Sequence, residues 1–343
     1  MSSRTNIVGI DVGGANLKFA DCYRNAFTIP FPLWKQRDQL TSALKAGLQQ
    51  FSDVGTLAVT MTGELADCYS CPQEGVEDIV QACLNAGQDF QVQFWQTSGE
   101  FVDADVAIEF FMLTSAANWL AQATWASRYF AETGNGLLID FGSTTTDIIP
   151  IIEGLPQPTG YTDFERLISG ELIYTGGSRT PLCSLANEIT FQGQTIGVAA
   201  ELFATTIDLE LILNPSHRIP PDTPTADGRP ADSEHAAQRF CRMLCTTPDQ
   251  FDTEELTELA HLFRNQQQVV FLRRLRQVLS NMPAAPAEVL VSGSHEYLAA
   301  QMITNSNLNL RTTSLNELAG PAVTTAACAY ALAVLMYERS RLQ

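Results

Sequence analysis

The hydrophobic pattern of the chain is clearest at residues 137–150, where two apolar runs flank a short polar turn. Residues 137–139 are Leu-Leu-Ile, as expected of a buried strand, and a second apolar run begins at Ile148. Asp140 ends the first run, and Gly142 permits a close turn. The pattern predicts a β-hairpin whose turn offers N–H groups and hydroxyls to an anion, beside a carboxylate suited to a hydrated divalent cation. An ordinary Thr-rich hairpin explains the pattern equally well.

The same pattern occurs earlier in the chain, at residues 7–20. Asp11 stands where Asp140 stands, and Gly13 where Gly142 stands, at a constant offset of 129 residues. Two related hairpins indicate a duplicated domain. Their turns are expected to face each other across a cleft and to hold one polyphosphate from both sides.

Apolar periodicity also predicts an alternation of strands and helices along the rest of the chain. Strands are expected at 26–33, 57–61, 90–95, 289–294 and 308–312. Helices are expected at 36–51, 74–86, 115–130, 199–213, 233–245, 253–282 and 321–337, with Ser233 and Thr253 as N-caps and closely packed alanines in the last. Residues 214–233 are rich in Pro, Asp, Gly and Thr, which indicates either a flexible lid or a disordered excursion.

The paired hairpins resemble the two phosphate motifs of the actin, sugar kinase and Hsp70 ATPase superfamily. Residues 289–294 resemble its adenosine motif, in which a glycine, here Gly293, lets the backbone approach the base or ribose. The resemblance implies an α/β, actin-like ATPase (ribonuclease H-like) fold with two related domains and an interdomain cleft. The expected domains are 1–134 with 321–343, and 135–320 with a helical or flexible insertion around 198–282.

Four further segments resemble the hydantoinase/oxoprolinase-related proteins of tetrahydromethanopterin-linked one-carbon metabolism, and this likeness covers nearly the whole chain. They are TMTGELADCY at 60–69, YTGGSRTP at 174–181, ELFATTIDLELIL at 201–213 and TADGRPAD at 225–232. That group includes the methanofuran-biosynthesis enzyme that joins an aminomethylfuran diphosphate to gamma-glutamyltyramine. The resemblance implies a Mg²⁺-dependent transferase that releases pyrophosphate, and it favours a loop at 225–232 that orders over substrate.

Two other classes of function stay open. The first is an ATP-dependent hydantoinase/oxoprolinase-like amidohydrolase or a small-molecule kinase, with ATP or ADP bound. Many sugar kinases of the superfamily carry an Asn-Asp pair whose aspartate acts as base, whereas residues 115–118 here are Ser-Ala-Ala-Asn, so a hydroxyl kinase is less expected. The second is a non-catalytic nucleotide-binding scaffold.

The candidate site residues follow from the two hairpins and from two polar loops. Glu64 and Asp67 follow a predicted strand end, where open α/β sheets bind ligands, and either could orient a substrate amine or accept a phenol proton; a solvated loop is the alternative. Arg179 lies in a Gly-rich loop and can grip a phosphate, although a surface turn is also compatible. The expected catalytic residues are Asp11, Lys18, Glu64, Asp67, Asp140 and Arg179, with Asp11 and Asp140 holding Mg²⁺. The expected phosphate- or nucleotide-binding residues are Gly13, Gly14, Asn16, Gly142, Ser143, Thr144, Thr145, Thr146, Gly293 and Ser294.

The composition of the chain limits the kinds of molecule that it can bind. The chain has 343 residues, enough for two domains, and a formal net charge of -18, which argues against nucleic acid or an acidic membrane as partner. We expect a small anionic substrate, a diphosphate or nucleotide, whose charge is balanced by a nearby basic side chain or a metal ion. The oligomeric state stays open, and a homodimer is one option. No signal peptide or long apolar run is apparent, so a cytoplasmic location is expected, with the eight cysteines as thiols. Arg273, Arg274 and Arg276 form the most basic patch, either an anion contact or a solvated helix face.

Overall fold

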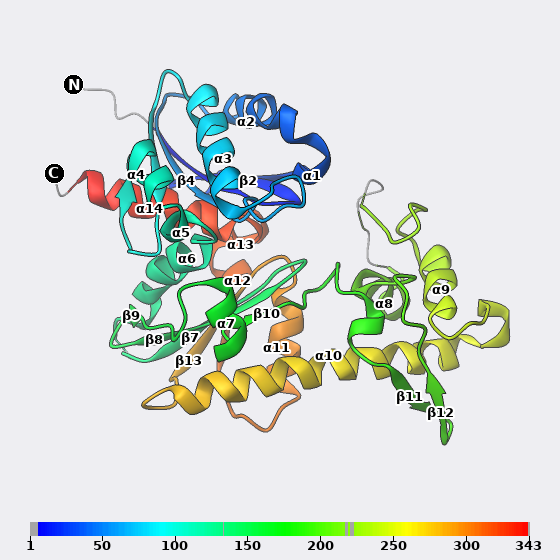
Figure 1. Ribbon diagram of the computed structural model, residues 1–343. Helices are drawn as coiled ribbons and strands as arrows, with labels where there is room; N and C mark the ends of the chain where they lie inside the picture. The colour runs from blue at the N-terminus through cyan, green and yellow to red at the C-terminus, as the bar shows by residue number, and fades with distance from the viewer. Residues whose placement is uncertain (1–5, 133, 217–218, 220–222, 342–343) are drawn as a thin grey trace.

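Two mixed β-sheets built to the same plan form the centre of the protein (Figure 1). The structure is a computed structural model that describes residues 6–132, 134–216, 219 and 223–341. The first sheet contains β1 (Asn6–Val12), β2 (Asn16–Asp21), β3 (Ala26–Pro30), β4 (Val54–Met61), β5 (Gln91–Trp95) and β6 (Phe101–Val102). The second contains β7 (Gly136–Phe141), β8 (Thr146–Ile152), β9 (Leu155–Pro156), β10 (Leu172–Ile173), β13 (Glu288–Ser292) and β14 (Thr312–Ser314).

The strand orders show the internal duplication. The first sheet runs β3-β2-β1-β4-β5-β6 and the second β10-β8-β7-β13-β14. In each, a leading hairpin pairs antiparallel, β1 with β2 and β7 with β8, and the first hairpin strand then pairs in parallel with a later strand, β4 or β13. Both predicted hairpins are therefore present, at equivalent places in two sheets of the same design.

Two helices, α6 (Asn118–Ala126) and α14 (Ala327–Ser340), lie between the sheets (Figure 1). One hydrophobic cluster joins side chains of both helices to side chains of both sheets. The approach of α14 to β1 is close, because a Cβ built on Gly9 would lie 1.9 Å from the carbonyl oxygen of Ala329. The small residues predicted for the last helix therefore serve close packing against a glycine in the central strand.

The outer face of the first sheet is covered mainly by α2 (Leu40–Leu48) and α3 (Pro72–Ala86). Their apolar side chains pack on alternate residues of β1, such as Val8 and Ile10. The helix predicted over 36–51 is interrupted: α1 (Leu33–Gln36) and a 3₁₀ turn come before α2. The remaining short helices of this domain are α4 (Ala104–Glu109) and α5 (Phe111–Thr114).

A separate lobe extends from the second sheet (Figure 1). It contains β11 (Glu188–Phe191), β12 (Gln194–Gly197), α8 (Thr206–Leu213), α9 (Ser233–Arg242) and the first half of α10 (Thr253–Asn281). Its hydrophobic cluster spans Leu182 to Phe263. The second half of α10 joins the core of the second sheet through Phe271 and Leu275. One long helix therefore carries the lobe on the second domain.

Several boundaries differ from the sequence expectation for identifiable reasons. The helix expected over 199–213 begins only at Thr206, because Thr205 and Asp208 form a capping box there. The N-caps of α9 and α10 are the aspartates at 232 and 252, one residue before the predicted Ser233 and Thr253. The strand expected over 308–312 begins at Thr312. In the stretch 214–233, residues 217–218 and 220–222 lie outside the described residues.

Among the described residues, no helix has both the length and the apolar character needed to cross a bilayer. All eight cysteines are free.

Candidate active site

The first hairpin places a partly buried ion pair between β1 and β2. Asp11 is only 1% exposed and lies opposite Lys18 in the β1–β2 register, with 3.2 Å between Lys18 Nζ and Asp11 Oδ2. Burial alone would lower the pKa of Lys18, but the nearby carboxylates of Asp11 and Asp140 hold this pKa above its usual value, so the amine stays charged. The other oxygen of Asp11, Oδ1, has no hydrogen-bond partner in the part of the chain that the structure describes.

The second hairpin brings Asp140 to the same ammonium group. Asp140 Oδ1 accepts hydrogen bonds from Ser292 Oγ at 2.7 Å and from Gln122 Nε2 at 3.3 Å. Burial and the charge of Asp147 raise the pKa of Asp140, while Lys18 and these two donors oppose the rise. The structure thus brings Asp11, Lys18 and Asp140 together, one pair from the first domain and one acid from the second.

Asp147 is the residue equivalent to Lys18, since Asp140 lies opposite Asp147 as Asp11 lies opposite Lys18. Its carboxylate accepts from Nη2 of the buried Arg166 at 2.5 Å. Arg166 belongs to α7 (Asp163–Ser169) and stacks on the Trp119 ring, with 4.2 Å from Cζ to the ring centroid. No sequence pattern points to Gln122, Arg166 or Trp119 as site residues. The repeat offset could have identified Asp147.

The second turn is held by the Gly-rich loop 174–181. Gly177 N donates to Gly142 O at 3.0 Å, and Arg179 N donates to Ser143 O at 2.9 Å. The loop can approach this closely because it contains Gly176, whose Cβ would lie 2.6 Å from the nitrogen of Thr144. Ser143, Thr144 and Thr145 are partly exposed and so remain available to a ligand.

Thr146 differs from the other residues of this turn. Its side chain is fully buried and its hydroxyl donates to Thr175 O at 2.8 Å. This hydroxyl fixes the turn to the neighbouring loop, and a contact of Thr146 with phosphate stays a prediction.

In the first turn, Gly13 N donates to Asn16 O at 3.0 Å, which closes the hairpin. A Cβ built on Gly14 would have no neighbouring heavy atom within 4 Å, so the backbone here is open to a ligand.

Arg179 connects the two domains above the second turn. Its guanidinium lies 5.5 Å from the ring centroid of Trp34, a residue of α1, and its Nη1 donates to Thr144 Oγ1 at 3.4 Å. Trp34 belongs to the first domain and Thr144 to the second, so Arg179 is placed where a bound phosphate could replace the long contact with Thr144.

Glu64 is the most unusual carboxyl group of the site. It is fully buried, and neither carboxylate oxygen has a hydrogen-bond partner at normal geometry among the described residues, although the N–H groups of Glu64 and Ala116 lie close enough to act on its charge. Burial raises its pKa to about 7; the negative charges of Asp163 and Asp11 add to this rise, and nearby backbone N–H groups only partly offset it. Asp67, the other predicted acid of this loop, is exposed and makes no hydrogen bond or ion pair with any described side chain.

Other buried polar atoms also lack partners. Ser115 Oγ, Trp119 Nε1 and Arg166 Nε are buried without a hydrogen bond in the described part of the chain. Ser115 precedes Ala116, whose backbone N–H lies near the Glu64 carboxylate. Each unsatisfied buried polar group costs about 1–3 kcal/mol, so a polar ligand that reached such an atom would gain from pairing with it.

The residues of the predicted adenosine motif make contacts with other parts of the protein. Gly293 has a φ of +97°, and a Cβ there would lie 2.5 Å from Phe141 O, so the glycine is needed to pack the β13 turn against β7. Ser294 Oγ lies 2.9 Å from Nδ1 of His295, and Nε2 of that ring lies 3.0 Å from Ser178 Oγ. The requirement for Gly293 is therefore internal packing.

The loop at 225–232 is fastened to its own lobe. Asp227 accepts hydrogen bonds from Arg239 at 3.1 Å and from Arg242 at 3.3 Å, both on α9, and pairs with Arg229 at 2.7 Å. These contacts hold the loop to α9, and its ordering over substrate stays a prediction.

Asp11 and Asp140 suit a hydrated magnesium ion. Asp11 Oδ1 is an unpartnered carboxylate oxygen, and Mg²⁺ binds through one or two carboxylates while keeping several waters. No set of three His, Cys, Asp or Glu side chains able to hold a metal occurs in the described residues, so an all-protein metal cage is not present there.

The two sheets of one design, each led by a hairpin, give the chain an α/β fold of the actin-like ATPase type with two related domains. The chain belongs to the hydantoinase/oxoprolinase family, whose model, described as Hydantoinase/oxoprolinase, matches residues 55–339. A nucleotide-free structure of acetone carboxylase is similar in fold, with a TM-score of 0.54 and 10% identity over 95% of this chain and 70% of that chain.

Two curated relatives carry the same name, (4-{4-[2-(gamma-L-glutamylamino)ethyl]phenoxymethyl}furan-2-yl)methanamine synthase. The one from Methanocaldococcus jannaschii is 33% identical over 97% of this chain and 98% of its own length. The one from Methanococcus vannielii is 32% identical over 59% of this chain and 90% of its own length. The chain is accordingly an enzyme of the synthase or transferase kind.

Proposed function

We propose that this enzyme condenses an aminomethylfuran diphosphate with gamma-glutamyltyramine and releases pyrophosphate. The observation that carries the proposal is Glu64, a buried and unpartnered carboxyl group within electrostatic reach of Asp11 in the first hairpin. The name of the full-length relative supports the choice of substrates, because a phenoxymethylfuran ether is what this condensation forms.

The two hairpin turns would hold the diphosphate. Gly13 and Gly14 on one side and Ser143 to Thr145 on the other offer backbone and hydroxyl donors, and Lys18 and Arg179 offset its charge. Asp11 and Asp140 would hold Mg²⁺, which supplies charge neutralisation for the leaving pyrophosphate.

The reaction breaks the bond between the furfuryl carbon and the diphosphate oxygen. Positive charge that develops on this carbon is delocalised into the furan ring, so stabilising the leaving group matters more than a strong nucleophile. The phenol oxygen of gamma-glutamyltyramine bonds to the carbon, and its proton passes to a base. Glu64 suits this role better than Asp67, because its pKa of about 7 matches the demands of a general base near neutral pH.

An ATP-dependent amidohydrolase or kinase is the second candidate, since the superfamily fold is shared with ATP-using enzymes. The contact of Ser178 with His295, next to Gly293, weighs against it, because these side chains of the adenosine-like motif already bond to each other. Incubation with Mg²⁺ and ATP separates the two: appreciable ADP formation would favour the second candidate.

The direct experiment mixes the enzyme with both substrates and Mg²⁺ and measures the coupled ether and pyrophosphate. We expect equimolar amounts of the two, without ATP, and strong loss of both on adding EDTA. Retained turnover in EDTA would remove the metal from the proposal, and absence of the ether with active, folded enzyme would reject the condensation.

A further inference from the structure

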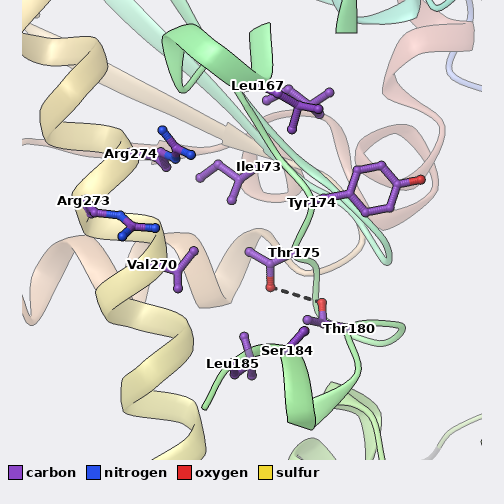
Figure 2. Close-up of a pocket in the computed structure, with 11 residues that line it drawn as sticks. Leu167, Ile173, Tyr174, Thr175, Thr180, Ser184, Leu185, Val270, Arg273 and Arg274 are labelled. Carbon is purple, nitrogen blue, oxygen red and sulfur yellow. Dashed lines mark hydrogen bonds between the residues drawn. The ribbon is translucent and has the colours of Figure 1, made fainter. Parts of the chain in front are cut away.

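A second pocket lies apart from the two hairpin turns, between α10 and the segment that runs from α7 to residue 185 (Figure 2). Its volume is about 260 Å³. That size suits a molecule with one ring or a short chain, because pockets for drug-sized ligands start at about 300 Å³. The residues that line it are Leu167, Leu172, Ile173, Tyr174, Thr175, Thr180, Ser184, Leu185, Val270, Arg273 and Arg274.

The walls of this pocket combine aliphatic side chains with two consecutive arginines of α10, of which Arg273 is exposed and Arg274 partly buried. Figure 2 shows Arg273 and Arg274 entering from α10, opposite Ile173 and Tyr174. Arg273 makes no hydrogen bond or ion pair with any described residue, and Arg274 donates only to Gln277, at 2.8 Å. Two arginines without an acidic partner are notable in a chain with 20 basic and 38 acidic residues, and guanidinium groups bind carboxylate or phosphate through paired hydrogen bonds.

The pocket shares its wall with the loop that holds the second hairpin turn. Thr175 and Thr180 line the pocket, and between them Gly177 N and Arg179 N donate to the turn at Gly142 O and Ser143 O. Gln267 of α10 donates to Thr175 Oγ1 at 3.0 Å and to the oxygen of residue 176 at 2.9 Å. A ligand wedged between α10 and this loop would therefore act on the backbone that positions the turn.

We propose that this pocket binds a small organic anion, with a carboxylate or phosphate head on Arg273 and Arg274 and a single ring or short chain against Leu167, Ile173 and Val270. The bound anion restrains the loop 174–181 and, through it, the second hairpin turn. Binding of the anion does not depend on the condensation reaction, because the residues that line the pocket take no part in that chemistry.

The test uses phenylacetate and phenyl phosphate as probes, benzyl alcohol as the neutral analogue and inorganic phosphate as the head group alone. Calorimetry on the full chain should show saturable binding of both aromatic anions, at about millimolar Kd or tighter, and binding at least about tenfold weaker for the other two. Arg273→Gln should weaken phenylacetate binding about tenfold or more.

Arg276→Gln is the matched control, since Arg276 is exposed on the same helix and does not line the pocket. It should leave phenylacetate affinity unchanged, and phenylacetate should slow amide hydrogen exchange at Gly177 and Arg179 in the wild type but not in Arg273→Gln. No saturable binding up to about 10 mM, or equal weakening by the Arg276 variant, would overturn the site. Binding without any change in exchange would overturn its link to the turn.

Discussion

Glu64 is the residue of the site whose environment most disfavours its charged form. Its carboxyl group is buried, lacks a partner among the described residues, and faces the negative charges of Asp163 and Asp11. Such a group binds its proton more tightly in the folded than in the unfolded chain. The raised pKa that suits Glu64 to accept a proton from a substrate must therefore also make the free energy of unfolding depend on pH.

Replacing Glu64 with glutamine should reveal this cost. The pKa rises from 4.5 to about 7 on folding, so the stabilising effect of the bound proton is present below pH 4.5 and is lost as the pH rises through 7. Unfolding by denaturant at pH 5 and pH 8 should show the wild type losing up to about 3 kcal/mol relative to Glu64→Gln over this interval. Parallel pH profiles for the two proteins would contradict the assignment.

The activity should follow the same titration. The kcat/KM of the wild type should rise with pH up to about 7 and then level off, because only the ionised carboxylate accepts the phenol proton. Glu64→Gln should lose this limb along with most of its activity. A pH–rate profile unchanged by the substitution would assign the base elsewhere.

Asp11 and Asp140 should act as one unit. Either Asp→Asn change removes a charge that a shared metal would require, so each should reduce turnover strongly while the double variant adds little further loss. Asp89→Asn, at an exposed carboxylate, is the control and should have no effect. If each aspartate merely capped its own turn, the free energy of unfolding would fall by about 0.5–2 kcal/mol, and activity would be largely retained. The melting temperature would then drop while turnover stayed nearly unchanged.

At this scale the sequence was informative where side chains follow a local motif. Asp11, Lys18, Asp140 and Arg179 lie at or beside the hairpin turns, as expected. Gln122 and Arg166 were not foreseen, because their roles arise from contacts across 18 or more residues of sequence that no local pattern encodes. The bond from Thr146 to Thr175 O was not foreseen either, because a threonine in a turn gives no sign of which partner its hydroxyl takes.

Among the elements, the buried central strands were predicted well, and helix starts were predicted correctly for α9 and α10 but not for α8. Apolar runs identify buried strands such as β7 and β13 directly, whereas a helix begins where a cap satisfies its first N–H groups. The apolar segment before Leu213 therefore reads as a longer helix than α8, which starts only after Thr205. The helix α10 contributes side chains to two hydrophobic clusters, so the boundary of the lobe falls within one continuous helix. Composition alone gives no sign of such a boundary.

The contact between β1 and α14 gives a test at the level of elements. Gly9→Ala would place a Cβ 1.9 Å from Ala329 O, so strand and helix must separate, and we expect a loss of stability of about 1–3 kcal/mol or more. Gly197→Ala is the matched control, because a Cβ there meets no atom within 4 Å. Equal melting temperatures for the two variants would show that α14 does not pack as described.

The whole molecule joins two copies of one sheet design around α6 and α14, and the duplication could be read from the offset between the two hairpins. The duplication could not predict the substrate or the reaction, since proteins of the same fold act on different substrates. The central claim is that a phenol oxygen of the acceptor attacks carbon and not phosphorus.

Acceptor labelled with ¹⁸O at its phenol oxygen tests this claim most directly. After a single turnover with the aminomethylfuran diphosphate and Mg²⁺, mass spectrometry should find the label in the ether product and none in pyrophosphate or in any phosphorylated acceptor. Label bonded to phosphorus would instead show phosphoryl transfer, the chemistry of a kinase, and would contradict the account.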